Sequence, residues 1–213
     1  MNETLKKAVM LYATEDLEKV MEFLGGLSKP TLISTLLDLL TVYFNDKNSS
    51  KLRELTTLWL CGFEPNLEKL GYNGYRMDIQ TGKVQHCEVK PQNTDNPKKK
   101  LNGGGSFNDY TEERLLADLR NNPNVLISGF VKGKLIYIIE VKFECLKDRL
   151  EKLLKKRFPS GRKSGEYLRS ASFSLKDYIN CPHFKLEYLR KDWQDFKEYL
   201  SKDLVSLFEV KTS

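Results

Sequence analysis

Long apolar runs are missing from this sequence of 213 residues. The best candidate, Leu32 to Phe44, is shorter than the roughly 20 residues that span a bilayer, and it carries Asp38. The first 20 residues place acids at both ends of their apolar part, so they lack the uninterrupted core of a secretory signal. These absences predict a protein without a membrane partner, located in the cytoplasm.

Cysteine and histidine are scarce. The chain has four cysteines, two histidines and no Cys-x-x-Cys motif. In a chain of this length without a secretory signal, we expect reduced thiols rather than a disulfide framework. Cysteine and histidine stand together at 86–87 and 181–183, where the spacing matches no standard zinc motif, so a zinc site is not predicted. The cysteines are Cys61, Cys87, Cys145 and Cys181.

Positive charge is concentrated in one part of the sequence. The net charge is +6, and residues 132–163 hold eleven basic and four acidic residues, a net +7, so the remainder sums to −1. A second basic run, 98–100, lies beside three glycines. Such clusters suit a nucleic-acid backbone, although a solvated helix face has the same composition. Charge therefore raises a nucleic-acid partner as a hypothesis and does not establish it.

Hydrophobic periodicity predicts a helical N-terminal segment, 1–48, packed on a core of mixed helices and strands, 49–213. The polar, glycine-rich stretch 92–109 is interpreted as a mobile loop. This order of elements predicts an α/β or α+β fold with a mixed sheet flanked by helices. The predicted helices are 5–24, 31–44, 51–60, 110–120, 146–158 and 184–208, and the predicted strands are 75–79, 84–89, 125–131, 135–143 and 167–173.

The most informative stretch runs from Asp78 to Lys90. A tight turn at Gly82 joins two short predicted strands, with Asp78 at the end of the first. Glu88 and Lys90 are two residues apart on the second strand, so they share one face of the sheet. We expect this hairpin to bring Asp78 and Glu88 to one point, with Lys90 beside them.

Two carboxylates and a lysine suit the hydrolysis of a phosphodiester bond. Carboxylates are hard oxygen ligands that hold Mg²⁺ and leave sites for water and phosphate. The ion would neutralise charge on the phosphate and lower the pKa of a bound water, and Lys90 would position that water. The carbonyl of Val89 is a further candidate ligand. The alternative is an ordinary hairpin with charged side chains on its polar face.

The pattern Asp78-x9-Glu88-x-Lys90 resembles that of the PD-(D/E)XK nuclease superfamily, which includes most type II restriction enzymes. The resemblance covers roughly residues 51–131: a helix, the hairpin, a second helix and a further strand. It implies a restriction-endonuclease-like mixed sheet, Mg²⁺ held by Asp78 and Glu88, and a lysine that assists the nucleophile. The sequence has Met77 where the family usually has proline.

Two further glutamates bear on this resemblance. The family often adds a glutamate from the helix before the hairpin, and Glu54 is the candidate. A second Glu-x-Lys, from Glu140 to Lys142, ends another predicted strand. No acid stands across its own hairpin, so we interpret Glu140 and Lys142 as a charged pair at a strand end.

The stretch after the hairpin is a candidate DNA-contacting segment. Backbone amides of a glycine-rich loop can approach phosphate closely, and the basic run lies beside it. The alternative is a flexible connector. The segment lacks the Gly-Lys-Ser/Thr ending of a P-loop, which argues against nucleotide hydrolysis. The candidate DNA-binding residues are Lys98, Lys99, Lys100, Asn102, Gly104, Ser106 and Asn108.

The leading hypothesis is therefore a Mg²⁺-dependent type II restriction endonuclease that cuts double-stranded DNA at a short specific sequence. One alternative is a repair or recombination nuclease that recognises DNA structure. Another is a nucleic-acid-binding domain without catalysis. The densely apolar stretch 31–44 is explained equally by a homodimer face or by burial within one chain.

Overall fold

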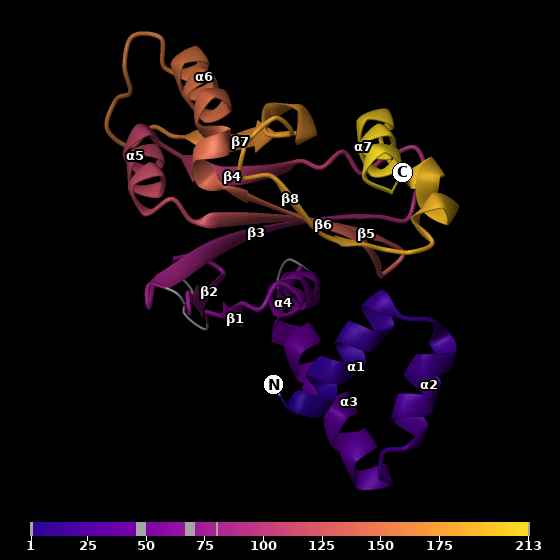
Figure 1. Cartoon of the computed structure of the whole chain (residues 1–213). Coiled ribbons are helices and arrows are strands. Elements are labelled where there is room, and N and C mark those ends of the chain that lie inside the picture. The colour runs from indigo at the N-terminus through magenta and orange to yellow at the C-terminus, as the bar shows by residue number, and fades with distance from the viewer. Residues whose placement is uncertain (1, 46–49, 67–70, 80, 213) are drawn as a thin grey trace.

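A computed structural model describes residues 2–45, 50–66, 71–79 and 81–212 as a mixed α/β protein. Its centre is an open six-stranded sheet flanked by helices (Figure 1). The helices are α1 (Glu3–Thr14), α2 (Leu17–Gly25), α3 (Lys29–Asn45), α4 (Lys51–Leu60), α5 (Glu112–Asn121), α6 (Lys147–Arg157) and α7 (Lys202–Thr212). The strands are β1 (Glu64–Pro65), β2 (Gly74–Met77), β3 (Val84–Thr94), β4 (Gly105–Tyr110), β5 (Asn124–Val131), β6 (Lys134–Lys142), β7 (Leu168–Phe173) and β8 (Lys185–Leu189).

The strands of the main sheet follow the order β1-β2-β3-β5-β6-β8. Neighbouring strands are antiparallel, except β3 and β5, which run parallel. A parallel pair needs a crossover connection, and here it runs through β4 and α5. Strand β4 pairs with β7 in a separate two-stranded sheet. Strand β5 is buried at every residue, as expected for a central strand covered on both faces.

Different helices cover the two faces of the main sheet (Figure 1). Val125 and Ile127 point to one face, where they pack with residues of α5, α6, α7, β4 and β7. Cys87 and Val89 point to the other face, where they pack with Leu58 of α4. We call these the α5 face and the α4 face.

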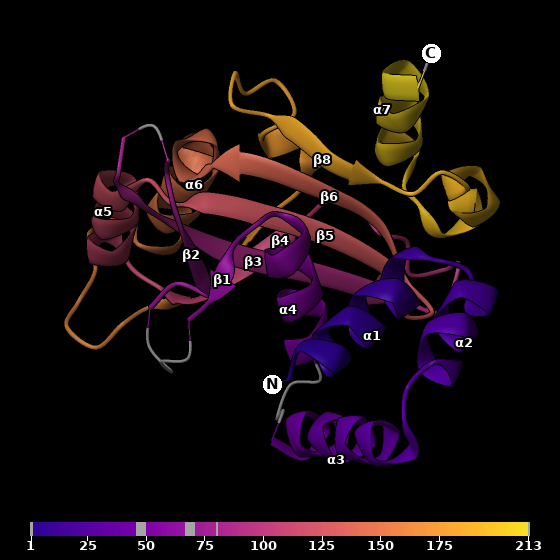
Figure 2. The same cartoon turned by 60° about the horizontal axis from the view of Figure 1, so that its bottom comes forward.

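The three N-terminal helices lie beyond α4, on the α4 face (Figures 1 and 2). Ala13 of α1 reaches the core, where it packs with Phe130 and Ile138. The Oδ1 of Asn2 caps α1 by accepting the Leu5 amide. Helix α3 lies at the periphery of the molecule (Figure 2). In the ranges described, no helix is both long enough and apolar enough to cross a bilayer.

Most predicted elements are confirmed, with changes in their bounds. The helices over 51–60 and 146–158 are α4 and α6, and the second predicted hairpin is β5–β6. The helix expected over 5–24 is divided into α1 and α2, because the backbone at Glu15 and Asp16 is extended. Gly26 then ends α2 as expected.

The helix expected over 184–208 was wrong. This part of the chain forms β8, a 3-10 helix over Trp193–Tyr199, and α7. The helix was predicted from apolar residues at helical spacing, and three of them, Trp193, Leu204 and Phe208, are nevertheless buried. Apolar spacing identified residues of the core, but it did not reveal that the chain changes direction between them.

The mobile loop expected over 92–109 was also wrong, because strand pairing orders this stretch. Strand β3 continues through Pro91 to Thr94, and β4 begins at Gly105. A Cβ on Gly105 would lie 2.8 Å from the Cβ of Lys90. Glycine therefore serves close packing of β4 on β3 here, rather than flexibility.

All four cysteines had been expected to be reduced thiols, but two of them are not. Cys145 and Cys181 form a disulfide that joins the segment after β6 to the segment before β8. Their Cα atoms are 5.7 Å apart across a sequence separation of 36. The expectation failed because this proximity is created by the pairing of β6 with β8, which cysteine spacing does not report.

Candidate active site

The expected hairpin is present, but its register separates Asp78 from Glu88. Met77, the last residue of β2, pairs with Val84, the first residue of β3. Asp78 lies beyond this pair, in the turn, whereas Glu88 lies four residues further along β3. At the usual rise per residue, their positions are about 16 Å apart along the strand. The hairpin therefore does not bring Asp78 and Glu88 to one point.

The carboxylate of Asp78 is bonded within and beside the turn. Its Oδ1 accepts the Thr81 amide over 3.1 Å, and its Oδ2 accepts Nε2 of Gln85 over 2.8 Å. Gln85 is three residues from Glu88 on the same strand, so it points to the opposite face. Asp78 is thus tied toward the α4 face, and its contacts stabilise the turn.

Glu88 and Lys90 share the α5 face, as their spacing predicted. They form an ion pair there. The Nζ of Lys90 lies 2.7 Å from Oε1 of Glu88, and the two side chains are only 17% and 13% exposed. The same Nζ lies 4.6 Å from the centroid of the Phe107 ring, which belongs to β4. The pair is therefore largely shielded from water. Its electrostatic interaction is stronger than that of an exposed pair, because the surrounding dielectric constant is lower.

Asp118 of α5 supplies a second carboxylate near this pair. It is buried, and it accepts hydrogen bonds from the hydroxyls of Tyr72 (3.0 Å) and Tyr110 (3.2 Å). Burial raises the pKa of Asp118, the hydroxyls of Tyr72 and Tyr110 and the guanidinium of Arg114, 3.7 Å from Oδ2, lower it in part, and the charge of Glu88 raises it. The ring of Phe107 lies between the partners of the two carboxylates, 4.6 Å from Nζ of Lys90 and 6.0 Å from the guanidinium carbon of Arg114. Asp118 could not be recognised from the sequence as a neighbour of this site, because it comes from the crossover helix and not from the hairpin.

Asn73 stands opposite Glu88, where an acid was expected. The β2–β3 register places it there, and its Oδ1 accepts the Val89 amide over 2.8 Å. The side chain of Val89 is buried on the α4 face, so only its backbone can serve the Glu88–Lys90 pair. The role of the Val89 carbonyl as a metal ligand stays a prediction.

Glu54 lies on the other side of the sheet from Glu88. It is one helical turn before Leu58, which packs on Cys87 and Val89 at the α4 face. Its carboxylate accepts the Ser50 hydroxyl over 2.8 Å. The preceding helix therefore does not bring Glu54 to the Glu88–Lys90 pair, because α4 covers the opposite face.

The candidate DNA-binding residues differ in accessibility. Lys98, Lys99, Lys100, Asn102 and Asn108 are exposed, and Ser106 is half-buried in β4. Gly104 is buried, and its amide already donates to Oδ1 of Asn102. The amide of Gly104 is thus engaged inside the protein rather than presented to phosphate.

The second Glu-x-Lys lies on the α4 face and has its own polar network. Glu140 is paired with Leu126, which points to that face, and it is 4% exposed. Its Oε1 accepts the Arg76 guanidinium over 3.1 Å, and Nε of Arg76 donates to Oε1 of Gln85 over 3.0 Å. Because Gln85 also bonds Asp78, a hydrogen-bonded chain links Asp78 to Glu140 rather than to Glu88.

The surroundings of Glu140 differ from those of an exposed charged pair. Its Oε2 is buried without a hydrogen-bond partner among the described residues. Burial raises the pKa of Glu140, Arg76 lowers it in part, and the carboxylate of Glu187 raises it again. Burial also lowers the pKa of Lys142. The interpretation of Glu140 and Lys142 as a charged pair at a strand end is therefore corrected: Glu140 is a buried member of a network with Arg76.

A metal ion is compatible with the residues around Glu88. The described ranges contain no cluster of three or more acidic, histidine or cysteine side chains suited to a metal. Mg²⁺ needs fewer protein ligands, because it keeps several waters and uses one or two carboxylates with phosphate oxygens. Glu88 and Asp118 are the carboxylates that could hold such an ion, although each already has a basic partner, Lys90 and Arg114 respectively.

The two Cys–His pairs have other contacts. Cys181 is bonded to Cys145, and Nε2 of His183 lies 3.1 Å from Glu144. The ring of His86 lies 5.4 Å from that of Tyr72. The disulfide leaves Cys181 without a thiolate to offer zinc.

Comparisons with known proteins do not place the chain in a family. No protein-family model matches the chain, and no curated protein is significantly similar to it in sequence.

Proposed function

We propose that the chain is a Mg²⁺-dependent endonuclease of the restriction-endonuclease-like fold, which cuts double-stranded DNA at a short specific sequence. The observation that carries the proposal is the shielded Glu88–Lys90 ion pair on β3, with Asp118 connected to it through Arg114 and the Phe107 ring. The order of elements supports it: α4, the hairpin, α5 and β5 follow one another as the resemblance implies.

In this proposal, Glu88 and Asp118 hold the ion, and Asp118 takes the place first expected for Asp78. A bound Mg²⁺ would offset phosphate charge and lower the pKa of a coordinated water. Lys90, oriented by Glu88, would position that water and donate to the phosphate. The hydroxyls of Tyr72 and Tyr110 fix the carboxylate of Asp118, as outer partners of metal ligands do.

A basic surface on the same side of the sheet would hold the duplex. Helix α6 packs over the α5 face, which also carries Glu88 and Lys90 (Figure 1). Its five exposed cations suit contact with phosphates, which position a duplex without reading its sequence. They are Lys147, Lys152, Lys155, Lys156 and Arg157.

One assay distinguishes the proposed function from its alternatives. The full chain is incubated with supercoiled plasmid and Mg²⁺, and separately with branched DNA. Discrete fragments that require Mg²⁺ are the expected result. Cutting of branched DNA alone would favour a structure-specific repair or recombination nuclease. DNA binding without any cleavage would favour a non-catalytic binding domain and contradict the proposal.

A further inference from the structure

A cavity of about 660 Å³ lies between the N-terminal helices and the sheet. Residues of α1, α2, α3 and α4 supply most of its walls, together with Asn93 of β3 and Phe130 of β5. Its volume is within the range of about 300–1,000 Å³ that is typical of small-molecule sites. The cavity lies on the α4 face, whereas Glu88 and Lys90 lie on the α5 face, so it is separate from the proposed cutting centre (Figure 1).

Most of the cavity lining is apolar, and part of this lining is open to water. Leu32, Ile33 and Leu36 of α3 line the cavity and are 42%, 50% and 55% exposed. Burial within one chain, one of the two explanations for the apolar stretch 31–44, therefore accounts for it only in part, and a homodimer face stays a prediction. Covering apolar surface stabilises a complex by about 25 cal/mol per Å², so this wall favours an apolar guest.

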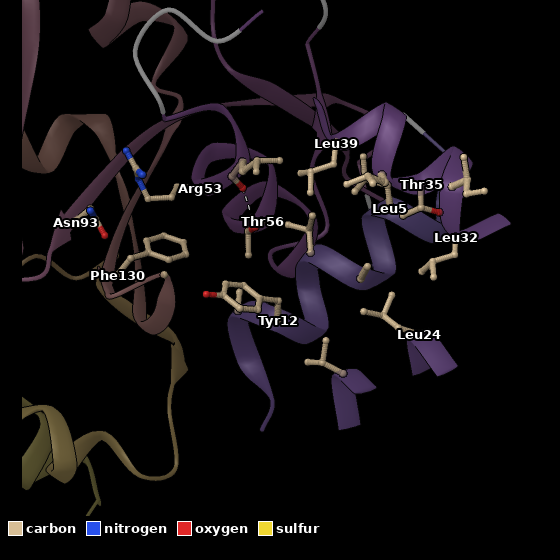
Figure 3. A pocket seen from close by; sticks show the side chains of 18 residues that line it. Leu5, Tyr12, Leu24, Leu32, Thr35, Leu39, Arg53, Thr56, Asn93 and Phe130 are labelled. Carbon is tan, nitrogen blue, oxygen red and sulfur yellow. Dashed lines mark hydrogen bonds between the residues drawn. The ribbon is translucent and has the colours of Figure 1, made fainter. Parts of the chain in front are cut away.

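One end of the cavity is polar and positively charged. Figure 3 shows Arg53 and Asn93 at this end, and the hydroxyl of Tyr12 points toward it. Arg53 is the one charged residue among the described residues that line the cavity. The labelled leucines at the opposite end are Leu5, Leu24, Leu32 and Leu39.

The charge of Arg53 is not offset within the described part of the chain. Its Nε is buried and has no hydrogen-bond partner among those residues, and no ion pair joins Arg53 to a carboxylate there. The carboxylate next to it in the sequence, that of Glu54, accepts the Ser50 hydroxyl instead. A cation that is partly removed from water is unfavourable unless it is paired, so an anion at this end of the cavity would stabilise it.

We propose that the cavity binds an aliphatic carboxylate, of which a fatty acid is the simplest form. The guanidinium of Arg53 offers N–H donors in a planar fork that matches a carboxylate, and Asn93 and Tyr12 supply neutral donors at the same end. The alkyl chain would lie among the leucines and cover the open wall of α3. A neutral apolar guest would leave Arg53 without a counter-charge, and a phosphate ion would leave the apolar wall in water.

The test is the binding of decanoate to the full chain, measured by isothermal titration calorimetry, with decanol as the neutral analogue of the same chain length. Decanoate is expected to bind at least about tenfold more tightly than decanol. Arg53→Met keeps an apolar stem without the charge, and it should weaken decanoate binding by about 10- to 100-fold, the usual effect of losing a charge-assisted hydrogen bond. Its affinity for decanol should be unchanged. Lys7→Met is the matched control, because Lys7 is exposed on α1 and does not line the cavity.

A second pair of variants tests the apolar wall. Leu36→Glu places a carboxylate in the lining of the cavity, so it should weaken the binding of decanoate and decanol alike by about tenfold or more. Leu37→Glu is its control, because Leu37 is 58% exposed on the same helix and does not line the cavity. Leu37→Glu should bind both molecules as the wild type does, and circular dichroism verifies that each variant keeps its helices.

Three outcomes would overturn the proposal. They are a wild-type chain that does not bind decanoate, an Arg53→Met variant that binds it with wild-type affinity, and decanol bound as tightly as decanoate, which would assign the cavity to a neutral apolar guest. The titration is carried out without DNA or Mg²⁺ and does not measure cleavage. Its failure is therefore distinguishable from failure of the proposed nuclease activity.

Discussion

At the scale of single residues, two glutamates with the same Glu-x-Lys spacing have different surroundings. Glu88 bonds the lysine two residues away, on the α5 face. Glu140 bonds Arg76 from another strand, on the α4 face, and leaves one oxygen without a partner. A short motif thus fixes which side chains share a face, and the strands around it determine what those side chains contact.

Glu140 is expected to make stability depend on pH. Because its pKa in the folded state is raised above the usual 4.5, the folded state binds the proton more tightly than the unfolded state. Its contribution to stability is full below the unfolded pKa and is lost as pH rises through the folded value. Glu140→Gln should therefore gain stability relative to wild type as pH rises. Urea unfolding of both proteins across this range checks it, and parallel pH profiles would contradict it.

Gly105 is expected to accept no side chain. A Cβ there would lie 2.8 Å from both the Lys90 Cβ and the Phe173 ring. Gly105→Ala should lower the free energy of unfolding by about 1–3 kcal/mol, since overpacking forces neighbours to shift. Gly25→Ala is the control, because nothing lies within 4 Å of a Cβ at that position. Equal effects of the two substitutions in urea unfolding would show that β4 does not pack on β3 in this way.

At the scale of elements, sequence patterns located most helices and strands but not their register. The alternation in 84–89 and the turn at Gly82 predicted the hairpin, and the spacing of Glu88 and Lys90 predicted their shared face. The meeting of Asp78 with Glu88 could not be read in this way, because it depends on which residues pair across the turn. Asp118 was hidden for a similar reason: its contacts with Tyr72, before β2, and Tyr110, on β4, depend on how the crossover helix α5 packs.

Asp78 is expected to act on the hairpin's stability. Its carboxylate accepts hydrogen bonds from Thr81 and Gln85. Asp78→Ala should cost about 1 kcal/mol, the usual net contribution of such bonds. Urea unfolding measures the change, and hydrogen exchange of the amides of Gly82 and Lys83 localises it to the turn. An unchanged unfolding midpoint would show that these bonds do not hold the turn.

At the scale of the whole molecule, the fold joins distant segments in ways that composition does not report. The disulfide between Cys145 and Cys181 joins the segment after β6 to the segment before β8, and α3 leaves large apolar side chains exposed. The order of elements in the sequence correctly predicted a mixed α/β chain. It could not predict which apolar helix stays exposed, because exposure depends on how the helices pack together.

The disulfide is expected to stabilise the whole domain. Closing a loop of 36 residues should contribute about 3–4 kcal/mol in the chain-entropy description. The double variant Cys145→Ser/Cys181→Ser should lose about this free energy of unfolding. Thiol titration gives an independent check, with two free thiols expected in denaturant before reduction and four after it. Burial raises the pKa of Cys61 to about 12, so this thiol should resist alkylation in the native protein. Four free thiols before reduction would contradict the cross-link.

We propose that Glu88 and Lys90, rather than Asp78 or Glu140, lie at the cutting centre. The most direct measurement compares Mg²⁺-dependent plasmid cleavage by Glu88→Gln, Lys90→Met, Asp78→Asn and Glu140→Gln, each verified as folded by circular dichroism. Glu88→Gln and Lys90→Met should lower the rate by about 100-fold or more, the usual cost of removing a group that stabilises the transition state. Asp78→Asn and Glu140→Gln should cut at close to the wild-type rate. Cleavage retained in Glu88→Gln and abolished in Asp78→Asn or Glu140→Gln would contradict the account.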